Sequence, residues 1–366
     1  MLFGRRELLV LAAGLTFACN KPAPAGDDKS AGAGSPAPVP SQAGPVSLNG
    51  AGATFPYPLY SKWIAEYNKQ FPNIKINYQS IGSGGGIRQI IAGTVDFGAT
   101  DAPMKDDEAK QAPGKLYHVP TTIGAVVVCY NLPEVTTGPL KLSPDVLADI
   151  YLGKIKKWND AKIAADNQDA KLPAKDISVV YRTDGSGTTN VYTDYLAAVS
   201  AEWKEKVGVG KSVKWPVGLG AKGNEGVTGQ IKTTPYTIGY TERAYATQNK
   251  LPMAELKNKA GKFIAPTTAA MSAAASGVEM PAELYVSLVN SAAEDAYPIA
   301  GYTYLLVYAD AKDPVKGEAI AKYLWWTLHD GQKFAETLDY APLPEKVVGL
   351  VEARLKELTG GGKKLL

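Results

Sequence analysis

The chain has 366 residues, 45% of them apolar and 20% charged, so it is long enough for two globular domains with a sizeable core. Its formal net charge of +3 is too small to indicate a nucleic-acid or polyanion partner. With only two cysteines and two histidines, the sequence offers neither a disulfide framework nor a convincing set of metal ligands.

Residues 1–19 have the features of an export signal. Two arginines precede an apolar run at 8–18, which is too short to span a membrane. The run ends in LTFACN, which resembles the lipidation site of bacterial lipoproteins, with Cys19 as the acylated residue. Thr16 and Phe17 depart from that pattern, so ordinary signal cleavage is the alternative. We expect an exported protein, in the periplasm or at the cell surface, held by a lipid anchor. The stretch GRRELL also resembles a twin-arginine signal, and the sequence does not separate the two export routes.

Residues 20–45 are mainly Pro, Ala, Gly and Ser, with almost no large apolar side chains. Such a segment buries too little surface to offset the entropy lost on folding. We therefore expect a disordered tether that spaces the folded part from a membrane surface.

From Val46 onward, strand and helix patterns alternate, which predicts an α/β fold with mostly parallel sheets. A continuous β-branched run predicts a buried strand that includes Cys129 as a small core residue. The expected strands are 73–79, 94–101, 121–131, 176–182 and 296–310, and the clearest helices are 85–93, the segment after Arg182, and 317–338.

Three loops rich in Gly, Ser and Thr stand directly before predicted helices. A helix start offers unpaired N–H groups and a partial positive charge, and glycine allows a ligand to approach the backbone closely. One such loop is weak evidence, but three of them together with Arg182 fit a small oxyanion. The stretches are GAGATFPYPLYSKWIAEY, SIGSGGGIRQII and RTDGSGTTNVYTDYL.

The sequence gives little support to an enzyme. Neither Ser83 nor Ser186 has the first glycine of the G-x-S-x-G nucleophile motif. The two histidines, His118 and His329, are more simply structural or surface residues. The stretch GVGKSV at 208–213 lacks the first glycine of a phosphate-binding P-loop. A secreted phosphatase is therefore only the weaker alternative.

Several long motifs, taken together and in order, resemble the periplasmic phosphate-binding proteins of high-affinity phosphate ABC transporters. They include LNGAGATFPYPLYSKW, SIGSGGGIRQIIAGTVDFGATDAPM, YRTDGSGTTNVYTDYL and VKWPVGLGAKGNEGV. The resemblance implies a non-catalytic monomer without a cofactor, which passes inorganic phosphate to a membrane permease. It also implies a two-lobe fold, with one lobe from 46–124 and 300–366 and the other from 125–299.

The resemblance further implies which residues hold phosphate in the cleft between the lobes. Gly84 stands where the family often has a second serine, which affects that position only, and Tyr297 replaces a common Trp outside the ligand set. The implied ligands are Thr54, Phe55, Ser83, Asp101, Arg182, Asp184, Ser186, Gly187 and Thr188.

The chemistry of these residues agrees with that assignment. Arg182 would supply a full positive charge and a fork matched to two oxygens, and Asp184 would hold the guanidinium or cap a helix. Asp101 is the informative residue, because a buried carboxylate beside an anion is favourable only if a proton of the ligand donates a hydrogen bond to it. Phosphate carries such a proton near neutral pH and sulfate does not. Asp101 could also serve simply as a turn residue, and a protein for another tetrahedral oxyanion is the second alternative.

Overall fold

The computed structural model describes residues 44–366. The predicted export signal at 1–19, Cys19 and all but the last two residues of the predicted tether at 20–45 lie outside the described residues. Within 44–366, no helix is both long enough and apolar enough to cross a bilayer.

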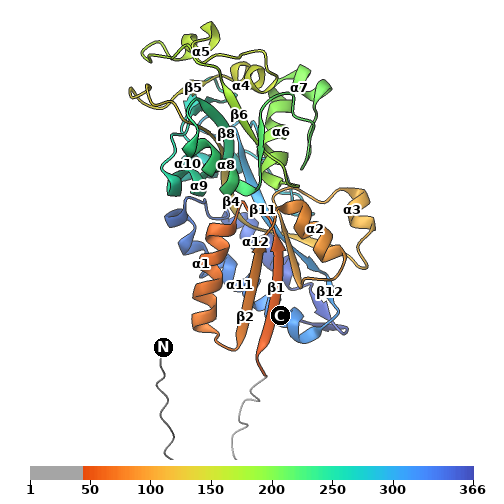
Figure 1. Cartoon of the computed structure of the whole chain (residues 1–366). Coiled ribbons are helices and arrows are strands. Elements are labelled where there is room, and N and C mark those ends of the chain that lie inside the picture. Colours follow the sequence, from red (N-terminus) through yellow and green to blue (C-terminus); the bar gives the residue numbers. More distant parts are fainter. Residues whose placement is uncertain (1–43) are drawn as a thin grey trace, which may run out of the picture. The chain divides into compact units, whose positions relative to one another are not determined.

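Eight strands form one continuous sheet in the order β2-β1-β3-β11-β4-β8-β6-β7 (Figure 1). β4 joins its two parts, because residues 116–125 pair with β11 whereas residues 126–130 pair with β8. We call β2, β1, β3, β11 and the start of β4 the first half-sheet, and the end of β4 with β8, β6 and β7 the second half-sheet. These strands are β1 (Val46–Gly52), β2 (Ile74–Ser80), β3 (Phe97–Thr100), β4 (Leu116–Tyr130), β6 (Ser178–Arg182), β7 (Leu219–Ala221), β8 (Thr237–Glu242) and β11 (Ala300–Tyr308).

The predicted α/β class is confirmed, and the sheet is parallel in its outer parts and antiparallel at its centre. The pairs β1–β2, β1–β3, β6–β7 and β6–β8 are parallel, whereas β3–β11, β11–β4 and β4–β8 are antiparallel. Two small sheets lie apart from the large one. They are formed by β5 (Lys141–Leu142), β9 (Glu255–Lys257) and β10 (Phe263–Ile264), and by β12 (Asp310–Ala311), β13 (Thr359–Gly360) and β14 (Lys363–Lys364).

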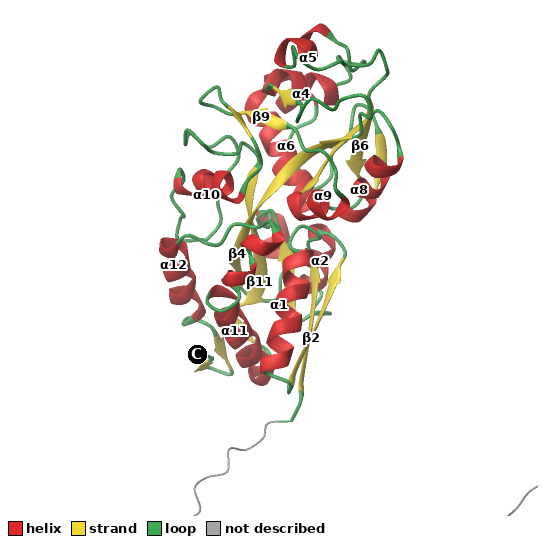
Figure 2. Ribbon diagram, turned by 90° about the vertical axis from the view of Figure 1, so that its left-hand side faces the viewer, coloured by secondary structure: helices red, strands yellow, loops and turns green. Residues whose placement is uncertain are grey.

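Helices cover both half-sheets (Figure 2). α1, α2 and α11 contact strands of the first half-sheet, and α6, α8 and α9 contact strands of the second. The helices are α1 (Tyr57–Gln70), α2 (Ser83–Ile91), α3 (Asp106–Lys110), α4 (Pro144–Tyr151), α5 (Ala161–Asp166), α6 (Gly187–Val199), α7 (Ala201–Lys206), α8 (Gly223–Thr233), α9 (Arg243–Asn249), α10 (Thr268–Ser276), α11 (Pro314–Leu328) and α12 (Glu345–Leu355).

The core strand β4 follows from its residues. Its β-branched run Val126, Val127 and Val128 is fully buried, as a strand covered on both faces requires. Cys129 is buried in the same run as a free thiol, which confirms its predicted role as a small core residue. α6 also follows the prediction, because it begins after the Gly-rich loop and buries Val191, Tyr192, Tyr195 and Leu196.

The prediction of one helix over 317–338 was wrong in its second half. α11 ends at Leu328, and His329 leaves the helical conformation with φ −110° and ψ −87°. Gly331 then packs so closely on Thr327 that a Cβ there would lie 2.8 Å from the Thr327 Cα. The remaining residues form two short 3₁₀ turns, at Gln332–Phe334 and Glu336–Leu338.

The two histidines have structural contacts. The Nε2 atom of His118, in β4, accepts a hydrogen bond from the Met104 N–H at 3.0 Å. Burial lowers the pKa of His118 to about 4. The Nε2 atom of His329 lies 2.8 Å from Glu352 at the surface.

Candidate functional site

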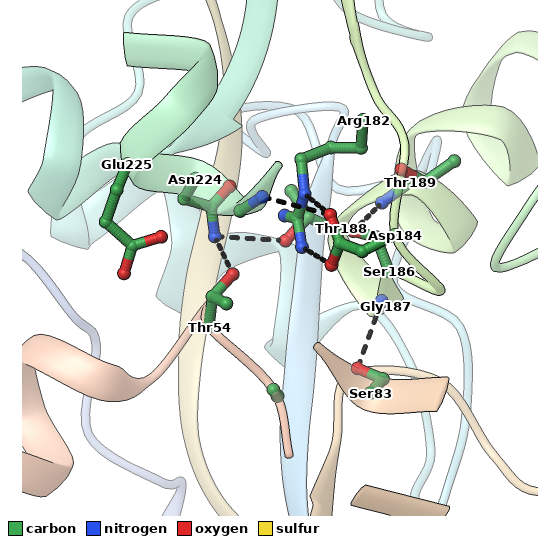
Figure 3. Close-up of polar contacts among 12 residues, drawn as sticks. Thr54, Ser83, Arg182, Asp184, Ser186, Gly187, Thr188, Thr189, Asn224 and Glu225 are labelled. Carbon is green, nitrogen blue, oxygen red and sulfur yellow. Dashed lines mark hydrogen bonds and ion pairs between the residues drawn. The ribbon is translucent and has the colours of Figure 1, made fainter. Parts of the chain in front are cut away.

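The loops at the starts of α1, α2, α6 and α8, which come from both half-sheets, contact one another (Figure 3). The loops that lead into these helices follow the carboxyl ends of parallel strands, which is where α/β sheets usually bind ligands. Thr54 follows β1, Asp101 follows β3, and Arg182 is the last residue of β6. The site is thus assembled from chain segments more than a hundred residues apart.

Glycines bring the loops of the two half-sheets into direct contact. The Gly187 N–H donates to Ser83 Oγ at 3.0 Å, and the Gly84 N–H donates to the Gly185 carbonyl at 2.8 Å. A Cβ on Gly187 would lie 2.5 Å from Asp101 Oδ2 and closer still to Ser83 Oγ. Only glycine at position 187 permits this approach.

Arg182 is held by Asp184 and keeps one nitrogen free. Its Nε and Nη2 atoms donate to the two carboxylate oxygens of Asp184 at 2.8 and 2.5 Å. Burial raises the pKa of Asp184, but the hydrogen bonds and charge of Arg182, with the Gly223 N–H, outweigh it and lower the pKa. Within the described part of the chain, Arg182 Nη1 is buried without a hydrogen-bond partner. A buried, unpaired guanidinium nitrogen is costly, so this atom indicates a place for an anion.

Asp101 is the buried acceptor of the site. It is 4% exposed, and its Oδ1 atom accepts from Thr303 Oγ1 at 2.8 Å. Its Oδ2 atom lies 3.4 Å from Ser83 Oγ. Burial raises the pKa of Asp101 to about 7, although these two hydroxyls and the charge of Arg182 act in the opposite direction. The carboxyl group can therefore share a proton near neutral pH.

The hydroxyl groups complete the set of donors. Thr54 and Thr188 are buried, and both hydroxyl oxygens accept from the side-chain amide of Asn224, at 2.8 and 3.3 Å. Ser186 caps α6, because its Oγ atom accepts from the Thr189 N–H at 3.0 Å. Each of these hydroxyls keeps its own hydrogen to donate.

An ion pair near the site links the loop between α7 and β7 to α3. Lys211 Nζ lies 2.8 Å from Glu108 Oε2, and the side chains are 10% and 24% exposed. The Ser186 N–H donates to the Lys211 carbonyl at 2.8 Å, which connects this ion pair to the cap of α6.

A small polar pocket adjoins these residues, with a volume of about 180 Å³. Its lining combines two hydroxyl groups, one lysine and two acidic groups. The residues are Thr54, Ser80, Ile81, Asp184, Lys222, Gly223 and Glu225. Among residues 44–366, no cluster of His, Cys, Asp or Glu could hold a metal ion. Hydroxyl donors, one arginine and one proton-sharing carboxyl group fit a small oxyanion.

Comparisons with known proteins agree with this geometry. A family model described as a PBP superfamily domain matches residues 38–330. The phosphate-binding protein PstS of Pasteurella multocida is 50% identical over 312 residues, which cover 85% of this chain and 90% of that protein. The chain belongs to the PBP superfamily and to its PstS proteins.

The chain shares its fold with solved structures of two proteins. A phosphate binding protein from Stenotrophomonas maltophilia matches with a TM-score of 0.64 at 18% identity, over 84% of this chain and 93% of that one. An ABC-type phosphate transport receptor from Vibrio cholerae matches with a TM-score of 0.54 at 17% identity, over 81% of this chain and 100% of that one.

In this PstS chain, the predicted side chains lie at one site, and their roles as ligands stay predictions. Phe55 contributes no polar side-chain atom; its ring is buried, and its carbonyl accepts from the Tyr340 hydroxyl at 2.7 Å. The sequence analysis missed Asn224, which contacts two of the predicted residues. Its signal was a fourth Gly-rich helix start, KGNEG, which lacks the Ser or Thr that marked the other three.

Proposed function

We propose that this chain binds inorganic phosphate between its two half-sheets and delivers it to an ABC permease for uptake. The PstS protein that matches over most of both chains supports this proposal. Like its PstS relatives, the chain is a binding protein and not an enzyme.

The observation that carries the proposal is the buried, unpartnered Nη1 atom of Arg182, which Asp184 holds in place. In the proposed complex, this nitrogen donates to one phosphate oxygen. The hydroxyls at positions 54, 83, 186 and 188 donate to the others, with the backbone of Phe55, Gly187 and the first turn of α6 around them. These groups supply donors only, which suits an ion with several unprotonated oxygens.

Asp101 decides between phosphate and sulfate in this proposal. Its buried carboxylate accepts one hydrogen bond from the protonated oxygen of phosphate. Sulfate has no proton to donate, so the carboxylate would be left unpaired beside it. A site that depends on a ligand hydroxyl can reject an analogue without it by about ten-thousandfold.

The test is calorimetry of phosphate and sulfate on protein stripped of bound ligand by unfolding and refolding. We expect tight phosphate binding and no heat of binding for sulfate. The Asp101→Asn variant should bind sulfate, and its affinity for phosphate should fall only moderately. If the protein binds both anions equally, the role of Asp101 is wrong. If it binds neither anion, the proposed function is wrong.

The finer organisation belongs to the same proposal. One lobe consists of 46–124 and 300–366 and the other of 125–299, and the lobes close on phosphate because ligand residues are divided between them. The change of partner along β4 between Ala125 and Val126 supports this division. X-ray scattering with and without phosphate would detect the closure.

The proposal also includes export, lipid attachment at Cys19 and a monomeric state. A PstS protein serves a membrane permease from outside the membrane, which agrees with the export signal that the sequence predicts. The intact mass of protein from the membrane fraction tests the lipid. Sedimentation of the protein without its lipid tests the monomer.

A further inference from the structure

Asn224 bridges the two half-sheets inside the site (Figure 3). It lies in the first turn of α8 and is fully buried. Its Nδ2 atom donates to Thr54 Oγ1 at 2.8 Å and to Thr188 Oγ1 at 3.3 Å. Thr54 follows a strand of the first half-sheet, and Thr188 lies in α6, which packs against the second, so one amide group contacts a hydroxyl from each side.

The other end of the amide fixes its orientation. Asn224 Oδ1 accepts from the Glu242 N–H and from the Thr241 hydroxyl, each at 3.3 Å. A backbone N–H can only donate, so the amide oxygen must face Glu242. The NH₂ group must then face the two threonine hydroxyls and act as the donor to both.

This orientation determines where the hydroxyl hydrogens point. A hydroxyl has one hydrogen and two acceptor positions, and Asn224 occupies an acceptor position on each threonine. In the part of the chain that the structure describes, neither hydroxyl has a second partner. Their hydrogens are therefore left to donate to a ligand.

The two serines of the site also accept from fixed donors, with backbone N–H groups in place of Asn224, while the Ser83 hydroxyl itself donates to Asp101 Oδ2 at 3.4 Å. Ser83 Oγ accepts from the N–H groups of Gly187 and Asp101, at 3.0 and 3.2 Å. Ser186 Oγ accepts from the Thr189 N–H at 3.0 Å. Fixed N–H groups thus fill acceptor positions on all four hydroxyls.

We propose that Asn224 is a positioning residue that directs the hydrogens of Thr54 and Thr188 toward the bound anion. This inference rests on the proposed function and adds to it a residue that need not touch phosphate. The side chain that holds the hydroxyls must be a donor, because an acceptor at position 224 would turn both hydrogens away from the anion.

The decisive variant is Asn224→Asp, which keeps the shape and the contact with the Glu242 N–H but replaces the donor by an acceptor. Because a hydrogen bond to a charged group is worth roughly 10- to 100-fold in affinity, we expect phosphate affinity to fall by about 100-fold or more. The added negative charge contributes to this loss, so the variant is also made in a Thr54→Val background. In that background the added negative charge still weakens phosphate binding, but the Thr54 hydroxyl that the Asp side chain would reorient is absent.

The double-mutant cycle separates the two effects. We expect Asn224→Asp to cost about 10-fold less phosphate affinity in the Thr54→Val protein than in the wild type. Equal losses in the two backgrounds would overturn the proposal. If the Asp variant does not fold, Asn224→Ala replaces it in the same cycle, with a smaller loss expected and the same comparison deciding.

Thr228→Val is the matched control, because the Thr228 hydroxyl donates to the backbone carbonyl of Asn224 at 2.8 Å and not to its amide side chain. We expect phosphate affinity within about twofold of wild type for this variant. A loss as large as that of Asn224→Ala would mean that α8 matters only for packing, which would contradict the proposal. If the wild-type protein does not bind phosphate, the proposed function fails, whereas a failure of the cycle alone leaves that function standing.

Discussion

Replacing Asp101 with Asn should make the phosphate-free protein more stable at alkaline pH and leave its stability in acid unchanged. The carboxyl pKa is raised from the ordinary value of 3.8 to about 7 in the folded protein, mainly by burial. At pH values between 3.8 and about 7, the folded state binds more protons than the unfolded state, so the free energy of unfolding falls as pH rises. The contribution of Asp101 is fully present below about pH 4 and is lost as pH rises through about 7.

The size of the effect follows from the shift. Raising a buried carboxyl pKa from 3.8 to about 7 corresponds to about 4 kcal/mol between the acidic and alkaline limits. Asn has no charge to desolvate, and its amide oxygen can keep the hydrogen bond from Thr303. Glu242, whose pKa burial also raises, contributes a pH dependence of the same sign to both proteins and cancels in their difference.

The assay is urea unfolding of both proteins in phosphate-free buffer between about pH 4 and 8.5. The free energy of unfolding in water is extrapolated with one common dependence on urea concentration for both proteins. We expect coincident stabilities at the acidic end. At the alkaline end, we expect the Asp101→Asn variant to be more stable than the wild type by up to about 4 kcal/mol. A difference that does not change with pH would refute the burial argument for Asp101.

Three further predictions concern phosphate binding. Arg182→Ala should lower the phosphate affinity by about 100-fold or more, because removing one partner of a buried ion pair also leaves the charge of Asp184 unpaired. Calorimetry measures this loss. Gly187→Ala should weaken phosphate by about 10- to 100-fold, because the new methyl group meets Ser83, whereas Gly226→Ala, where a Cβ has ordinary contacts, should bind normally in the same titration. Lys211→Ala should speed phosphate release about threefold in stopped flow by breaking the ion pair to α3, and an unchanged rate would show that this pair does not hold the two half-sheets together.

Local patterns predicted much of the fold. The β-branched run of β4 and the alternating residues of β2 determine strands by burial alone, and each lies where the sequence predicted it. The end of α11 was missed because apolar residues continue at helical spacing beyond Leu328, and tertiary packing of Gly331 overrides that pattern.

The site, like the fold, could be predicted only where its residues form a local pattern. Glycine and hydroxyl residues before helices can be recognised locally, because the chemistry of a helix start is local. The contact of Asn224 with Thr54 joins residues 170 positions apart, and no spacing rule predicts it. The bond of Tyr340 to the Phe55 carbonyl, 285 positions away, is equally invisible in the sequence.

The position of β11 has a consequence for the order in which the protein can fold. β11 lies between β3 and β4, so residues 300–308 fill the space between two strands from the first 130 residues of the chain. The first half-sheet therefore stays incomplete until roughly the first 300 residues have been made. The N-terminal segments therefore cannot complete a native core while the rest of the chain is still being made.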